Sequence, residues 1–222
     1  MARKSTKVNA NNTVDTQAGI FDFQPVIMKV RLTLLEDMLG ASPNDKEIYS
    51  TFVASKGPNA MTKEEEVAAI GVEEYEEKQM TVFCRNEDGN PIIFNYVIKG
   101  FFKNACGALR YINGSLSKGI TSYKKKIDGL IFIDERQIPI NYEGKIGICQ
   151  RPLRAQTAQG DRVALASSES IPAGSTLECT IRIMDPTLVP VVTEWLNYGR
   201  YNGLGQWHNS GKGAFTWEEI TE

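Results

Sequence analysis

Apolar and polar residues alternate in several short stretches of the chain, and this period of two is typical of half-buried β-strands. In residues 25–35, apolar side chains alternate with Lys29, Arg31 and Thr33, which predicts a strand with one face on a core. Further β-rich runs predict strands at residues 80–85, 91–97, 129–133, 137–140, 145–149, 162–167, 175–184 and 214–217. An Asp-Gly turn at residues 88–89 joins two of these runs and predicts a hairpin.

Two other segments show the spacing of three and four residues that is typical of amphipathic helices. Residues 100–116 carry one apolar stripe, and residues 187–201 carry a second, with Gly203 just beyond its end. Two crossover helices among mostly antiparallel strands predict an α+β fold. We expect a ferredoxin-like (RRM-related) antiparallel sheet with the helices on one face.

Polar segments flank and interrupt this framework. Residues 1–20 lack apolar periodicity and are expected to form a disordered polar tail, which leaves residues 21–222 as a single domain. Residues 36–79 are punctuated by Gly, Pro and Asn and predict an insertion between strands. Residues 150–161 are polar and predict a protruding loop.

The insertion is expected to contain two short helices, at residues 45–55 and 62–78. The second begins with a Thr-x-x-Glu capping-box pattern and holds seven glutamates from Glu64 to Glu77. We interpret these carboxylates as a solvated helix face and not as a metal site, because no His or Asp completes a cluster.

Composition narrows the class of protein. The 222 residues are 41% hydrophobic and 23% charged, which excludes collagen-like and wholly disordered chains. The four cysteines form no CxxC pair, so the ligand spacing usual for a zinc site is absent. Cys84, Cys149 and Cys179 lie in apolar or alternating stretches, and we expect these three thiols to be reduced. No window reaches the roughly 18 apolar residues of a membrane span. We expect a cytoplasmic protein without metal or cofactor.

Charge is distributed unevenly along the chain. Residues 1–98 hold 10 Lys and Arg against 15 Asp and Glu, a net charge of −5. Residues 99–162 hold 12 against 5, a net charge of +7. This positive third predicts a face that binds a polyanion, while solvated surface cations remain the alternative interpretation. Within it, the candidates by charge are Lys124, Lys125, Lys126, Arg151, Arg154 and Arg162.

A glycine-rich loop follows the second predicted helix. Residues 203–213 read GLGQWHNSGKG, with Gly203, Gly205, Gly211 and Gly213 bracketing Trp207 and His208. Backbone amides without a neighbouring Cβ can approach phosphate oxygens, Lys212 adds charge, and Trp207 or His208 offers a ring for base stacking. A tight structural turn is the alternative explanation of these glycines. The loop follows a helix and precedes a strand, the reverse of a dinucleotide-binding fingerprint.

This loop resembles the signature of the RAMP superfamily, the repeat-associated RNA-binding proteins of CRISPR systems. Residues 98–110 (IKGFFKNACGALR) are similar to the helix start of that family, and residues 169–175 (ESIPAGS) resemble its turn into a strand. The resemblance spans roughly residues 25–217. It implies a ferredoxin-like domain that binds single-stranded RNA, closest in type to the backbone subunits that assemble in several copies along a guide RNA.

The resemblance also implies roles for particular residues. The helix start would contribute Lys99, Lys103 and Arg110, and the glycine loop would contribute Trp207, His208 and Lys212. Residues 150–161 lie where such subunits carry a projecting thumb. Phe101 and Phe102 replace a small polar pair of the family pattern, which places the phosphate-binding role of that turn in doubt.

Two further functions remain open. A metal-independent endoribonuclease needs a general base and a general acid, and His208 is the single histidine of the chain; Asp37 and Asp45 lie in the early region where some related subunits carry a catalytic aspartate. Alternatively, a solitary or virus-encoded relative joins or blocks a CRISPR complex through the acidic residues 60–78. The leading expectation is an RNA-binding protein without catalytic residues, either a homo-oligomer or a subunit of a ribonucleoprotein.

Overall fold

The computed structural model describes residues 24–43, 80–157 and 160–220, with side chains omitted at residues 153–164. The elements, in order, are β1 (Val26–Leu34), β2 (Met38–Leu39), β3 (Ser42–Pro43), β4 (Thr81–Val82), β5 (Cys84–Arg85), β6 (Pro91–Phe94), α4 (Asn95–Leu109), η1 (Leu116–Gly119), α5 (Tyr123–Leu130), β7 (Ile131–Ile133), β8 (Gln137–Asn141), β9 (Gly147–Thr157), β10 (Gly160–Ile171), β11 (Thr176–Ile183), η2 (Pro186–Leu188), α6 (Val189–Tyr198), η3 (His208–Ser210) and β12 (Phe215–Glu219).

The main sheet has the strand order β12-β1-β11-β8-β6-β5, and β7 also pairs with β11. β1 lies between β12 and β11 and is antiparallel to both, with Val30 opposite Cys179 of β11 and Glu219 of β12. Burial alternates along β1, as the period-two pattern predicts. The mixture of antiparallel sheets and helices confirms the predicted α+β class.

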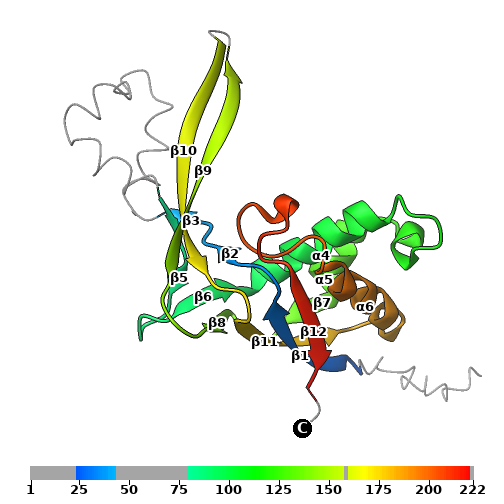
Figure 1. The fold of residues 1–222 in the computed structure, drawn as a ribbon. Helices are drawn as coiled ribbons and strands as arrows, with labels where there is room; N and C mark the ends of the chain where they lie inside the picture. The colour runs from blue at the N-terminus through cyan, green and yellow to red at the C-terminus, as the bar shows by residue number, and fades with distance from the viewer. Residues whose placement is uncertain (1–23, 44–79, 158–159, 221–222) are drawn as a thin grey trace, which may run out of the picture.

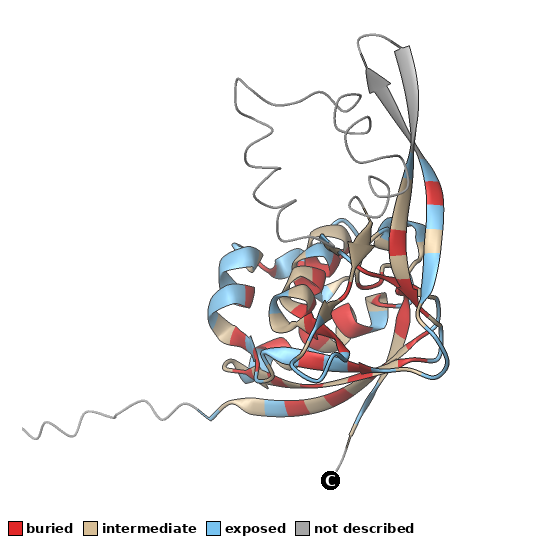
Figure 2. Cartoon of the chain, turned by 90° about the vertical axis from the view of Figure 1, so that its left-hand side faces the viewer, coloured by how far each residue is buried: buried red, intermediate tan, exposed pale blue. Residues whose placement is uncertain are grey.

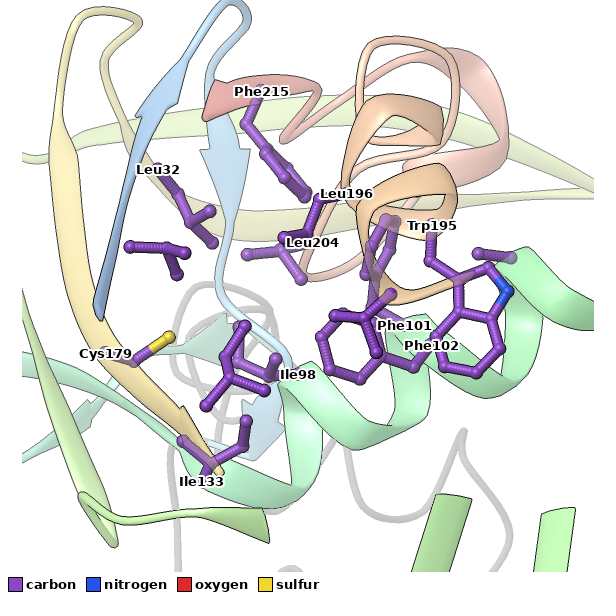
Figure 3. Packing of buried hydrophobic residues seen from close by; sticks show 14 of the residues in the cluster. Leu32, Ile98, Phe101, Phe102, Ile133, Cys179, Trp195, Leu196, Leu204 and Phe215 are labelled. Carbon is purple, nitrogen blue, oxygen red and sulfur yellow. The ribbon is translucent and has the colours of Figure 1, made fainter. Parts of the chain in front are cut away.

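The helices gather on one face of this sheet (Figure 1). α4 follows β6, and α6 leads into the glycine-rich loop and then to β12. Between helices and sheet lies one apolar core, in which Phe101 packs edge-on against Phe215 at 5.1 Å between ring centroids and Phe102 lies 5.5 Å from Trp195 (Figure 3). Burying these large rings accounts for a major share of the stability of the domain.

A second sheet has the order β2-β10-β4-β3, with β9 paired to β10. β9 and β10 form a long antiparallel hairpin that projects from the rest of the chain (Figure 1), with Ser170 opposite Gly147 at its base. The predicted protrusion is therefore present, but the expectation of an irregular loop at residues 150–161 is wrong. Its strands carry exposed apolar residues, Ile148 near the base and Leu165 farther out, since a projecting hairpin covers no core. In Figure 2, exposed and buried positions are interspersed along the described part of the hairpin.

Several boundaries differ from the sequence prediction. α4 ends at Leu109 and not at residue 116, and α6 covers Val189–Tyr198 instead of residues 187–201. α4 begins at Asn95, five residues before the expected start, so Phe101 and Phe102 lie inside the helix and are buried. The lysine-rich residues 122–126, for which the sequence predicts neither a helix nor a strand, belong largely to helix α5. The predicted hairpin around the Asp-Gly turn is confirmed, because β5 pairs antiparallel with β6.

Several predictions lie outside the described residues. These are the polar tail at residues 1–20, the two helices of the insertion, Asp45 and the acidic segment 60–78. Within the described part, all four cysteines are free, and burial raises the pKa of Cys179 to about 12. Cys106 and Cys179 are buried, whereas Cys84 and Cys149 are only half-buried. None of the described helices is long and apolar enough to cross a membrane.

Glu194 on α6 connects the helical layer to η1. Its carboxylate accepts hydrogen bonds from the backbone N–H groups of Leu116 (2.9 Å) and Ser117 (3.1 Å) and from the hydroxyls of Ser115 (3.1 Å) and Ser117 (2.6 Å). The Trp195 indole N–H donates to the same Ser117 hydroxyl at 2.9 Å. Burial alone raises the pKa of Glu194, but these hydrogen bonds outweigh burial and hold the pKa below its ordinary value of 4.5.

We expect Glu194→Ala to lower the free energy of unfolding by about 2 kcal/mol at neutral pH, because it leaves several donors unpaired. The pKa of Glu194 is lower in the folded than in the unfolded chain, so its contribution is present above pH 4.5 and is lost as the pH falls through the folded-state pKa. The difference between wild type and variant should therefore shrink in acid. Urea denaturation at several pH values measures it.

Glu218→Ala is the matched control, since this exposed carboxylate pairs with Arg31 at 3.0 Å on the sheet surface. We expect a change within about 0.5 kcal/mol for that variant. Equal stability of wild type and Glu194→Ala at neutral pH would show that the hydrogen bonds of Glu194 contribute nothing.

Candidate nucleic-acid interface

The glycine-rich loop, residues 203–213, closes on itself. The N–H of Leu204 donates to the carbonyl of Gly213 at 3.0 Å. A Cβ on Gly203 would lie 2.0 Å from the carbonyl carbon of Gly213, and a Cβ on Gly213 would lie 2.0 Å from the oxygen of Leu204. Gly213 also has φ of +68°. Glycine is required at both positions because two backbones cross in contact.

The same loop packs on the short strand β2. The N–H of Gln206 donates to the carbonyl of Leu39 at 3.1 Å, and the N–H of Gly213 donates to the carbonyl of Asp37 at 2.8 Å. Gly205 has φ of +81°, and a Cβ there would lie 2.4 Å from the Leu39 oxygen. These contacts favour the structural explanation of Gly203, Gly205 and Gly213, and the amides that make them are not available to a phosphate.

Trp207 is an exposed residue of the loop, as are Asn209 and Ser210. It adopts the left-handed conformation with φ of 57° and is 43% exposed. The guanidinium of Arg151, on β9, lies over its ring at 4.9 Å from the centroid. A cation at this distance orients the indole and is attracted by its π system. The structure therefore brings together the loop and one of the predicted arginines.

Arg151 is nearly completely buried, with 6% of its surface exposed. One terminal nitrogen donates to the side-chain oxygen of Gln206 at 2.7 Å, and the other lies 3.4 Å from the hydroxyl of Ser168. The Gln206 oxygen also accepts from Ser168 at 3.1 Å and from Thr81 at 3.3 Å. These four side chains form the network that we call the Arg151 cluster.

The Arg151 cluster contains no carboxylate among the described residues, and Nε of Arg151 is buried without a hydrogen-bond acceptor. A buried cation is costly unless an anion compensates it. Neutral amide and hydroxyl oxygens compensate it only in part. Chemically, the buried guanidinium places a positive potential beneath the Trp207 ring, and this potential favours an anionic group such as a phosphate at the surface beside that ring.

The other predicted groups of the loop have partners inside the chain. The Nδ1 atom of His208 lies 3.0 Å from the carbonyl oxygen of Gly205. The Nζ of Lys212 lies 3.7 Å from carboxylate oxygens of both Glu36 and Asp37. Asp37 in turn accepts a hydrogen bond from the N–H of Ala173 at 3.1 Å. The two carboxylates partly neutralise Lys212, so the loop offers less positive charge than the sequence predicts.

The cations of the first predicted helix contact α5 and β7. Lys99 donates to the carbonyl of Asp128 at 3.1 Å and lies 5.1 Å from the ring centroid of Phe132, and burial lowers its pKa. Lys103 forms an ion pair with Asp128 at 2.7 Å, and this hydrogen bond lowers the pKa of the carboxyl group. Arg110 lies over the ring of Tyr123. None of these contacts involves the glycine loop.

The remaining predicted cations divide into two groups. Lys124, Lys125 and Lys126 are exposed on α5. Arg154 and Arg162 belong to the hairpin strands, but their side chains lie outside the described ones.

Gly211 is the remaining glycine of the loop. It has φ of +89° and no crowding around its Cβ position, so a positive φ is its only structural requirement.

Sequence reasoning missed Gln206, Ser168 and Thr81. Gln206 stands between Gly205 and Trp207, but an uncharged amide gives no chemical signal of its own. Ser168 and Thr81 come together only because β10 and β4 pair in parallel at these two residues. Among residues 24–43, 80–157 and 160–220, no group of three His, Cys, Asp or Glu side chains is placed to hold a metal ion.

No family model matches the chain, and no curated protein matches it. Among solved structures, one similar chain belongs to the Type III-B Cmr-beta complex bound to cognate target RNA, with 10% identity and a TM-score of 0.48 over 88% of this chain. The match covers 58% of that chain, so the present chain spans less than two thirds of its length. A chain of the Type IV-B CRISPR complex is similar at 10% identity and a TM-score of 0.45, over 88% of this chain and 91% of that one.

Proposed function

We propose that this protein binds single-stranded RNA as a RAMP-type subunit of a CRISPR-associated ribonucleoprotein in the cytoplasm. The proposal rests on the sequence resemblance and on the Arg151 cluster beside Trp207. Several copies would bind along one RNA, and a guide RNA is the preferred ligand. Arg154, Arg162 and the exposed lysines of α5 would add phosphate contacts.

The topology supports a ferredoxin-like core for this domain. If β1, β7 and β8 together, β11 and β12 are counted as the first to fourth strands, their order is fourth, first, third, second. α4 stands between the first and second, and α6 between the third and fourth. All the pairings among these strands are antiparallel. This is the arrangement expected for an RRM-related sheet with two crossover helices.

The observation that carries the proposal is the buried Arg151, which has no carboxylate partner among the described residues and lies against a half-exposed tryptophan. Arg151 lacks an anion to compensate its charge, and Trp207 has an exposed ring that can take a stacking partner. A nucleotide supplies both, since its phosphate is an anion and its base is a planar ring. Paired bases inside a duplex cannot stack on Trp207, which favours a single strand. Cleavage is not part of the proposal, because metal-independent cleavage needs both a general base and a general acid, and His208 is the single histidine of the chain.

Fluorescence anisotropy with a labelled single-stranded RNA tests this function. If about three phosphates are neutralised, we expect the affinity to fall roughly 20-fold between about 50 and 200 mM salt, because condensed counterions are released on binding. An RNA duplex of the same length should bind more weakly, because its bases are paired. Absence of binding at low salt, or an affinity that does not change with salt, would contradict the proposal.

A further inference from the structure

A small apolar pocket lies beside the glycine loop, on the side where α4 begins. Its volume is about 160 Å³, and its walls come from β2 to β6, the first turn of α4 and Gly205. This is smaller than the roughly 300 Å³ at which drug-sized ligand sites begin. The pocket therefore suits a single ring system and not an extended molecule.

The chemistry of the walls restricts the ligand further. They contain no charged side chain, and most of the lining is apolar, including Leu39, Val82, Phe83 and Ile92. The hydroxyl of Ser42 and the thiol of Cys84 lie within the lining, 2.9 Å apart. A charged group would lose its hydration there without compensation. An uncharged planar group with a few polar atoms is the ligand that these walls accept.

The rim of the pocket carries an aromatic stack. The rings of Phe94 and Tyr96 lie 5.5 Å apart at an interplanar angle of 14°, so they are nearly parallel. Both residues line the pocket, and Tyr96 is 63% exposed. A large exposed aromatic residue that is held parallel to a second ring offers a flat surface on which a third ring can stack.

The pocket is linked to Trp207 through Gly205. Gly205 lines the pocket, and Trp207 follows two residues later, a separation of at most about 7 Å between the Cα atoms. Arg136 lies next to the helix start, where its carbonyl accepts a hydrogen bond from the N–H of Asn95 at 3.2 Å, and its own side chain is exposed. The pocket with Tyr96 at its rim and the Trp207 ring beside Arg151 are therefore both connected to the segment around Gly205.

We propose that Tyr96, supported by Phe94, is a second base-stacking site, and that an unpaired base of the bound RNA occupies the apolar pocket while a nearby base of the same strand stacks on Trp207. The inference rests on the proposed function and adds to it a defined two-base contact on either side of Gly205. Phosphates of this strand stay outside the pocket, toward Arg151 and Arg136.

Anisotropy with a labelled single-stranded RNA, and with an abasic strand of the same length, tests this inference. We expect Tyr96→Ala to weaken binding of the RNA about 10-fold, because one base loses its stacking partner. Tyr96→Phe keeps the ring and should bind within about twofold of wild type. Tyr111→Ala is the matched control, since Tyr111 is exposed beyond the far end of α4 and does not line the pocket. The abasic strand should bind wild type and Tyr96→Ala equally.

A second readout uses the half-buried thiol of Cys84 in the pocket wall. Saturating RNA should slow alkylation of Cys84 several-fold in wild type, and the abasic strand should not. If RNA binds wild type but Tyr96→Ala binds equally well and Cys84 is not protected, the second site is wrong while the proposed function stands. If wild type binds no RNA at low salt, the proposed function itself fails.

Discussion

Replacing Gly213 by alanine is expected to lower the free energy of unfolding by about 4 kcal/mol, one of the largest effects of a single substitution in this chain. Two causes add. The backbone φ of +68° is unfavourable for an L-residue by roughly 1–2 kcal/mol. The new Cβ would also lie 2.0 Å from the oxygen of Leu204, and separating them disrupts the hydrogen bond that closes the loop. Thermal unfolding should show a Tm about 10 °C lower.

Two other glycines separate these causes. Gly211 has φ of +89° but no atom near its Cβ position, so Gly211→Ala should show only the smaller conformational cost. Gly100 lies within α4 with nothing near its Cβ position, and alanine there should be neutral or stabilising. If Gly213→Ala and Gly211→Ala unfold at the same temperature, the backbone crossing is not what requires glycine at position 213.

Replacing Arg151 by methionine is expected to weaken RNA binding about 100-fold, or roughly 3 kcal/mol. The substitution removes the buried positive charge that, in the proposed function, attracts a phosphate to the surface beside Trp207, and it removes the cation that lies over the Trp207 ring. It also replaces a buried charge by an apolar side chain of similar length, which is neutral or stabilising in many proteins. The RNA affinity, measured by anisotropy, should therefore fall, whereas the Tm, measured by thermal unfolding, should stay unchanged or rise.

Arg200→Met provides the matched control, because Arg200 is exposed after α6 and takes no part in the Arg151 cluster. It removes the same charge from the chain and should change RNA affinity by no more than about twofold. An Arg151→Met protein that is folded and binds RNA as tightly as wild type would overturn the assignment of Arg151 as an anion contact.

The strands of the main sheet were predictable because one of their faces is buried. In β1, Met28, Val30, Leu32 and Leu34 are buried and alternate with more exposed residues, which is the pattern read from the sequence. Residues 150–161, the outer part of the hairpin of β9 and β10, were predicted as a loop for the opposite reason. The hairpin projects away from the core, so packing does not impose alternation on its outer residues, and polar residues there resemble a loop.

Helix boundaries were less predictable than helix existence. α4 begins after Phe94, which makes no side-chain capping hydrogen bond, and its first turn holds no acidic residue. The usual sequence signals for a helix start are therefore missing. α5 buries only Ile127 fully, so its eight residues show little apolar periodicity although lysine is a good helix former.

For the candidate site, the sequence predicted the loop and Arg151 separately but not how they meet. Arg151 and Gln206 are 55 residues apart, and their 2.7 Å hydrogen bond depends on how the base of the hairpin lies against the glycine loop. The charge of residues 99–162 also could not distinguish which of their cations lie near the loop, because each Lys or Arg counts equally. In the structure, Lys99 and Lys103 contact α5 and β7, and among the cations of this segment whose side chains are described, Arg151 is the one that lies over the Trp207 ring.

Asp37 joins three segments that are distant in sequence. Its side chain holds the turn before β11 through Ala173, its carbonyl holds Gly213, and Lys212 lies near its carboxylate. Asp37 lies in an early loop, so it would be a natural residue to substitute in a search for a catalytic aspartate. Inactivity of an Asp37 variant would nevertheless be ambiguous, because the substitution removes a brace between β1, the turn and the loop as well as a carboxylate.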